Sequence, residues 1–114
     1  WIEYRITDAT GIDADGRFWV FNQFWPGEAD RVDARRDALG SVDRPGGRPV
    51  ERIVGLRSDG GGVVVDETAG LIELLTRDDD VARNWEGLAR MDGDGFLVVT
   101  DQHPRTIFAY VSRR

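Results

Sequence analysis

The fold of this chain is indicated by the stretch Phe18-Trp19-Val20-Phe21, an unbroken apolar run that follows an Asp15-Gly16 turn. A second run, Phe96-Leu97-Val98-Val99, follows Gly95 in the same way. Short apolar runs bounded by turn residues are typical of strands that are covered on both faces. We therefore expect both runs to be strands inside antiparallel sheets.

Further strands are indicated by β-branched and aromatic residues between glycine-rich turns. The segment 106–111 alternates, with Ile107, Ala109 and Val111 on one face and Phe108 and Tyr110 on the other. Val50 to Leu56 and Gly62 to Val65 supply two more strands, and turns at these intervals favour a β meander. The sequence predicts an all-β chain with antiparallel strands at 17–24, 50–57, 95–101 and 106–112.

A helical alternative exists for residues 70–91. Leucines 71, 74 and 75, with Val81, Trp85 and Leu88, fall partly at helical spacing. Against a helix stand Gly70, Gly87 and the run Asp78-Asp79-Asp80, because these residue types prefer caps and turns. We therefore expect no continuous helix over this segment.

A weak internal repeat links the two halves of the chain. Thr10-Gly11-Ile12 with the Asp15-Gly16 turn resembles Glu86-Gly87-Leu88 with Asp94-Gly95, and a buried strand follows each turn. The alignment predicts that Asp8 and Thr10 share one rim of a sheet with Asn22 and Gln23.

The segment Asn84-Trp85-Glu86-Gly87-Leu88-Ala89, followed by 95–101 and 106–111, resembles the closing blade of bacterial β-propellers of the SdiA-regulated and phytase-like esterase families. Residues 15–22 resemble the central hairpin of an earlier blade. The resemblance implies antiparallel four-stranded blades. One blade would occupy about 1–77, with a long loop at 25–49, and a closing blade about 84–114.

Propellers usually carry 4 to 8 blades of roughly 40 to 45 residues each. The 114 residues therefore predict an incomplete portion of two to three blades. We expect either a longer parent chain, in keeping with a start at Trp1, or association of several copies. Exposed sheet edges template pairing, so the 114 residues alone are expected to self-associate.

Polar residues gather where the predicted strands of the closing blade begin and end. Because successive strands are antiparallel, Asn84, Glu86, Asp101 and His103 are expected on one rim. Oxygen ligands from Asn84, Glu86 and Asp101 suit Ca²⁺. Propellers of the gluconolactonase kind are similar in placing a metal among Glu, Asn and Asp ligands. The alternative is that Glu86 and Asp101 pair with arginines or main-chain amides.

Three further residues are candidates for ligand binding, namely Asn22, Trp25 and His103. Trp25 could offer a stacking face, and His103, the only histidine, could act as a base with Asp101. A solvated turn position is the alternative for His103. Arginines in the loop 25–49 could bind a phosphate-bearing ligand, although acidic residues interleave with them.

Composition excludes several classes of function. A net charge of −6 argues against nucleic-acid binding. The absence of cysteine excludes disulfides, thiolate zinc sites and a thiol nucleophile. No apolar run reaches the roughly 20 residues of a membrane span. The sequence does not identify the compartment, and it is compatible with a periplasmic or a secreted protein.

Three functions follow from these observations. The first is a ligand-binding or scaffold β-propeller segment that binds calcium. The second is a calcium-dependent hydrolase of phosphate esters, esters or lactones. The third is a protein-interaction module.

Overall fold

The computed structural model describes residues 2–28, 39, 49–74, 83–93, 95–101 and 105–113. These residues form antiparallel β-sheets and one short 3-10 helix, η1. The elements are β1 (Arg5–Ala9), β2 (Arg17–Phe24), η1 (Pro26–Glu28), β3 (Val50–Ser58), β4 (Val63–Val65), β5 (Leu71–Glu73), β6 (Trp85–Met91), β7 (Gly95–Thr100) and β8 (Phe108–Ser112). No helix among them is long and apolar enough to cross a membrane.

The first sheet has the order β1-β2-β3-β4, and β5 also pairs with β3. One part of β3 pairs with β5, from Arg52↔Glu73 to Val54↔Leu71, and its last part pairs with β4, from Leu56↔Val65 to Ser58↔Val63. A turn at Asp66, whose N–H donates to the Gly55 carbonyl at 2.9 Å, separates β4 from β5. The two short strands therefore form one interrupted edge.

The second sheet contains β6, β7 and β8 in chain order. Its strands and those of the first sheet confirm the all-β prediction, because β2, β3, β7 and β8 lie at the expected segments. The helical alternative is wrong for the described part of 70–91, which holds β5 and β6.

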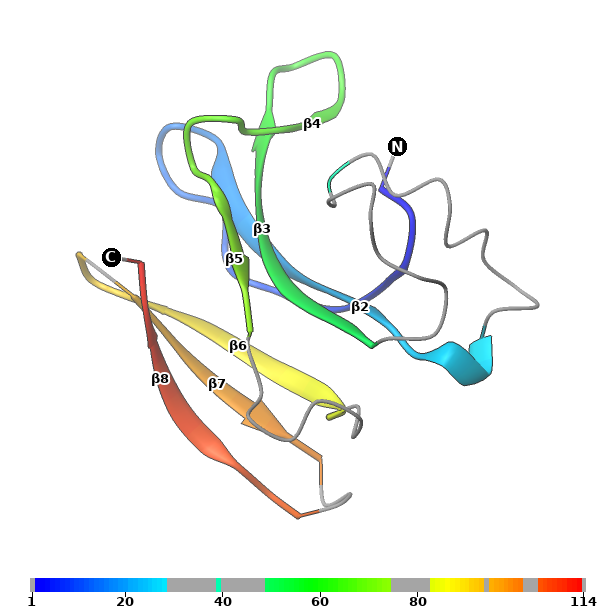
Figure 1. Cartoon of the computed structure of the whole chain (residues 1–114). Coiled ribbons are helices and arrows are strands. Elements are labelled where there is room, and N and C mark those ends of the chain that lie inside the picture. Colours follow the sequence, from blue (N-terminus) through cyan, green and yellow to red (C-terminus); the bar gives the residue numbers. More distant parts are fainter. Residues whose placement is uncertain are drawn as a thin grey trace.

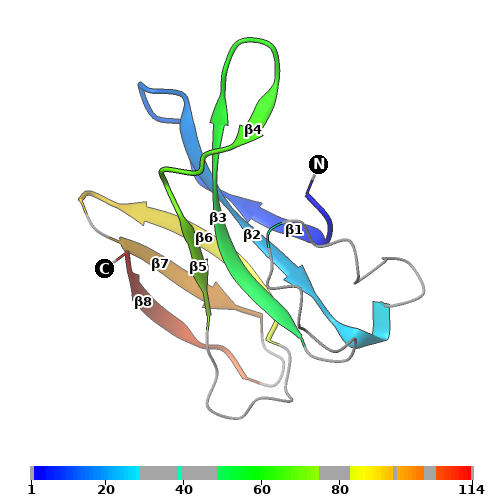
Figure 2. The same cartoon turned by 45° about the horizontal axis from the view of Figure 1, so that its top comes forward.

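The two sheets pack against each other through one apolar core (Figures 1 and 2). Ring centroids of Trp19 and Phe96 lie 5.6 Å apart, and those of Phe21 and Trp85 lie 5.8 Å apart. Leu88 and Val98 complete the contact from the second sheet. Trp85 is thus a core residue between the sheets.

The internal repeat is wrong in its first half. Because β1 ends at Ala9, Thr10-Gly11-Ile12 lies in the connection to β2, whereas Glu86-Gly87-Leu88 lies inside β6. The register Arg5↔Gln23 and Ile6↔Asn22 brings Arg5, rather than Asp8 or Thr10, to the end that Asn22 and Gln23 occupy. The strands that follow the two Asp-Gly pairs do correspond, because β2 begins at Arg17 and β7 at Gly95.

Candidate functional site

The first strands of the two sheets, β1 and β6, lie side by side. Thr7 Oγ1 donates to the Trp85 carbonyl at 2.7 Å, and Asp8 Oδ2 accepts the Leu88 N–H at 2.7 Å. These contacts advance in the same direction along both strands, so β1 and β6 run parallel. Side chains of β1, rather than its main chain, thereby satisfy polar groups on the edge of β6.

Trp85 is fixed at both its main chain and its indole. The buried Gln23 amide donates Nε2–H to the Trp85 carbonyl at 2.7 Å and accepts the Trp85 N–H at 3.1 Å. The Trp85 indole donates Nε1–H to Glu51 Oε2 at 2.9 Å, while Glu51 Oε1 accepts the Arg83 N–H at 2.5 Å. A buried residue with every polar group engaged positions the start of β6 rigidly.

The three predicted metal ligands come together at this start of β6. The Asn84 side-chain amide donates to the Glu86 carboxylate, and the Asp101 N–H donates to the Asn84 carbonyl at 2.9 Å. Glu86 and Asp101 are exposed and Asn84 is half-buried. The Arg5 guanidinium also takes part, because its Nη2 donates to Asn84 Oδ1 at 3.3 Å.

This arrangement defines what the start of β6 can bind. A carboxylate, a carboxamide and a guanidinium face one another at an accessible place, so they can offer both acceptors and donors to a polar ligand. The Asn84 oxygen that a metal would need is occupied by a cationic donor. Within the described ranges no three carboxylate or imidazole groups are gathered closely enough to hold a metal ion.

The predicted ligand-binding residues have different surroundings. Asn22 is fully buried, with its Oδ1 accepting from Arg52 Nε at 2.8 Å and its Nδ2 donating to the Arg5 carbonyl at 3.5 Å. Trp25 is 56% exposed just after β2. His103 and the loop arginines at 31, 35, 36, 44 and 48 lie outside the described residues.

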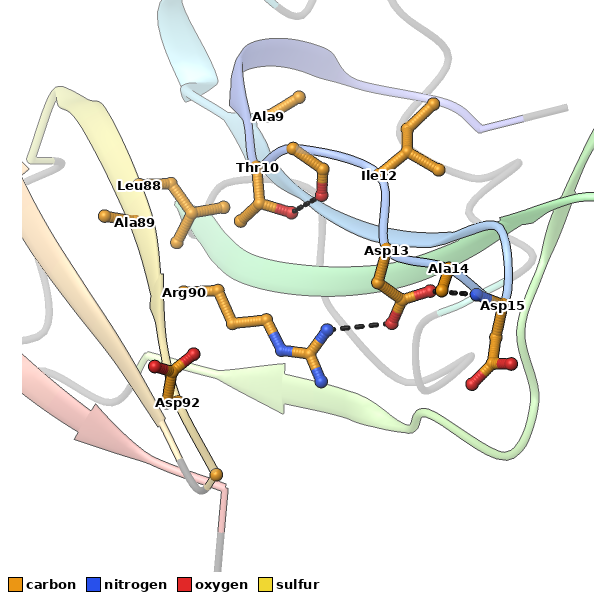
Figure 3. A pocket seen from close by; sticks show the side chains of 12 residues that line it. Ala9, Thr10, Ile12, Asp13, Ala14, Asp15, Leu88, Ala89, Arg90 and Asp92 are labelled. Carbon is orange, nitrogen blue, oxygen red and sulfur yellow. Dashed lines mark hydrogen bonds and ion pairs between the residues drawn. The ribbon is translucent and has the colours of Figure 1, made fainter.

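A groove that the sequence analysis missed lies between the β1–β2 connection and the β6–β7 hairpin (Figure 3). Its main polar feature is Asp13, whose Oδ1 accepts the Asp15 and Arg17 N–H groups at 2.9 Å each. Asp13 Oδ2 pairs with Arg90 Nη1 at 2.8 Å. The hydrogen bond from Arg17, and next that from Arg90, lower the pKa of Asp13.

The sequence could predict one side of this groove but not the contact between its two sides. On one side, the Asp15-Gly16 turn was visible in the sequence and is confirmed, with the Gly16 N–H donating to the Asp13 carbonyl at 3.0 Å. The ion pair of Asp13 with Arg90, 77 positions away, carries no local pattern. The Arg90 guanidinium also lies 4.4 Å from the centre of the Trp19 ring, so Arg90 links the second sheet to the first by an ion pair and a cation–π contact.

Comparison with known protein families, curated proteins and solved structures gave no match to this chain.

Proposed function

We propose that this chain is a ligand-binding segment of a β-propeller-like scaffold. The arrangement of its sheets supports the proposal. The adjacent strands β1 and β6 each begin a sheet whose strands then follow in chain order away from the contact between them. Such sheets stacked around their first strands are the unit from which propellers are built. Residues 5–73 would form one blade and 85–112 the next.

The ligand contacts would lie at the start of β1 and β6, where Arg5, Asn84 and Glu86 meet. This cluster carries the proposal, because it joins two sheets, is accessible and combines opposite charges. A binding site at the contact between two sheets can use side chains from both of them, as this cluster would. Trp25 lies just beyond the end of β2, whose Gln23 pairs with Arg5, and its exposed ring would add a stacking surface.

Calcium is the proposed ligand at Glu86, with Asn84 and Asp101 as further oxygen donors. Binding would require the Asn84 oxygen to exchange Arg5 for the metal. A ligand that binds only the folded state raises stability by about 2.7 kcal/mol at one hundred times its Kd. Millimolar calcium is therefore expected to raise the melting temperature of the chelator-treated protein.

The variant Glu86→Gln is expected to remove most of this rise, because it deletes a charged ligand. Arg5→Gln is expected to enlarge it, since a competing cation is gone. Asp92→Asn, at an exposed position in the β6–β7 turn, also replaces a carboxylate by an amide, and this control should behave like the parent. Identical melting temperatures with calcium and with chelator would refute the calcium site. The hydrolase hypothesis requires the same metal, so this titration tests it first.

A further inference from the structure

The outer edge of the second sheet has no strand beside it among the described residues. In the first sheet the third strand, β3, is covered on its outer edge by β4 and β5, whereas β8 pairs only with β7. The Thr100 N–H donates to the Ile107 carbonyl at 2.9 Å. Because bonded and non-bonded pairs alternate along an antiparallel ladder, Phe108 and Tyr110 direct their N–H and C=O groups away from β7.

The face that Phe108 and Tyr110 share is apolar. Phe108 is 70% and Tyr110 56% exposed, and they lie opposite Val99 and Leu97 of β7. Ala89 and Met91 continue this face on β6, opposite Leu97 and Gly95. In a chain with 32% charged residues, these strands present an uncharged surface beside an open edge.

Among the described residues the edge strand β4 pairs with β3 alone. Its Asp66 end is bonded to Gly55, so by the same alternation Val63 and Val65 direct their main-chain groups away from β3. Val63 is 60% and Val64 40% exposed. The β3–β4 hairpin projects beyond the rest of the first sheet, as both views show (Figures 1 and 2).

The residues that flank these two strands have opposite charges. β4 lies between Asp59 on one side and Asp66 and Glu67 on the other, whereas β8 lies between Arg105 and Arg113 with no acidic residue inside. An antiparallel pairing with Val64 opposite Ala109 brings Glu67 next to Arg105, whereas Asp59, whose N–H donates to the Gly62 carbonyl, lies across the β3–β4 turn on the side away from β8. The same register aligns Val63 with Tyr110 and Val65 with Phe108, the residues with outward main-chain groups.

We propose that β4 of one copy of this chain adds to the open edge of β8 in a second copy. The interface joins two different surfaces, so it is head-to-tail and extends to further copies unless a ring closes. It supplies the second sheet with the fourth strand that the first sheet already has. The proposal does not depend on ligand binding at Arg5, Asn84 and Glu86.

Proline variants test the pairing without disturbing either sheet. Val63→Pro and Phe108→Pro each remove an outward N–H at the first residue of an edge strand, a position where proline is tolerated. The controls Val63→Thr and Phe108→Thr keep that N–H. We expect the parent to show a concentration-dependent mass above the monomer in analytical ultracentrifugation, and each proline variant to be monomeric with an unchanged circular dichroism spectrum.

Mixing the two proline variants gives the decisive result. The Phe108→Pro chain still has an intact β4 and the Val63→Pro chain an intact β8, so the mixture is expected to form a dimer that grows no further. A parent that is monomeric at every concentration would overturn the proposal. So would a mixture that stays monomeric, or a Val63→Pro chain that associates like the parent, because either result means that β4 is not the strand that binds.

Discussion

The two edges of the second sheet differ, because side chains of the first sheet bond to one of them and no described strand covers the other. On the β6 edge, Thr7 and Gln23 bond the main chain of Trp85, and Asp8 bonds that of Leu88. On the β8 edge, Phe108 and Tyr110 present exposed rings and outward main-chain groups. A sheet edge can thus be closed by side chains of a neighbouring strand as well as by a strand in register. The side-chain-bonded edge holds the two sheets together, and the open edge is left for association.

The largest effect is expected from Trp85→Ala, which removes the centre of the side-chain-bonded edge. Truncating a buried aromatic residue costs about 3–5 kcal/mol, and here Glu51 also loses its indole donor. Denaturant unfolding should show this loss. Trp25→Ala is the matched control, because Trp25 is exposed and its removal should change the free energy of unfolding by no more than about 0.5 kcal/mol. Equal effects of the two variants would contradict the core role of Trp85.

A smaller loss in the free energy of unfolding is expected from Gln23→Met, which keeps the length of the side chain. The Trp85 carbonyl would still accept from Thr7, but the Trp85 N–H would lose its partner. An unpaired buried amide costs about 1–3 kcal/mol.

Thr7→Val makes the complementary change, because the Trp85 carbonyl keeps the Gln23 amide. Its cost in the same unfolding experiment is expected to be smaller than that of Gln23→Met. The reverse order would mean that Thr7, rather than Gln23, provides the main bond to this edge.

The smallest effect on stability is expected at the ion pair between Asp13, beyond the end of β1, and Arg90, in the last part of β6. The pKa of Asp13 lies below its ordinary value of 3.8 in the folded protein. Its charged form therefore stabilises the fold above the unfolded-state pKa, and this contribution disappears as the pH falls through the folded-state pKa.

Asp13→Asn is accordingly expected to lower the melting temperature slightly near neutral pH, and the difference from the parent should close below about pH 4. Asp15→Asn serves as the control, since Asp15 contributes only its N–H to the turn. A difference that stays constant from neutral to acidic pH would assign the effect of Asp13→Asn to something other than its charge.

The sequence predicted the strands with apolar runs and could not predict β1. The segment Arg5–Ala9 is largely polar because Thr7 and Asp8 bond to β6, so it lacks the composition of a strand. At the start of β6 Asn84 and Glu86 are in contact and Asp101 is adjacent, and the metal that they were expected to hold stays a prediction. Arg5 was missed there because its approach to Asn84 depends on the packing of sheets formed by distant segments.

The difference between the two edges can be measured directly by residue-resolved amide hydrogen exchange in dilute protein. The account predicts slow exchange at Trp85 and Leu88, whose N–H groups are bonded to Gln23 and Asp8, and fast exchange at Phe108 and Tyr110. Raising the protein concentration should then slow exchange at Phe108 and Tyr110 while Trp85 and Leu88 stay unchanged. Equal protection of both edges in dilute protein, or fast exchange at Trp85, would contradict the account.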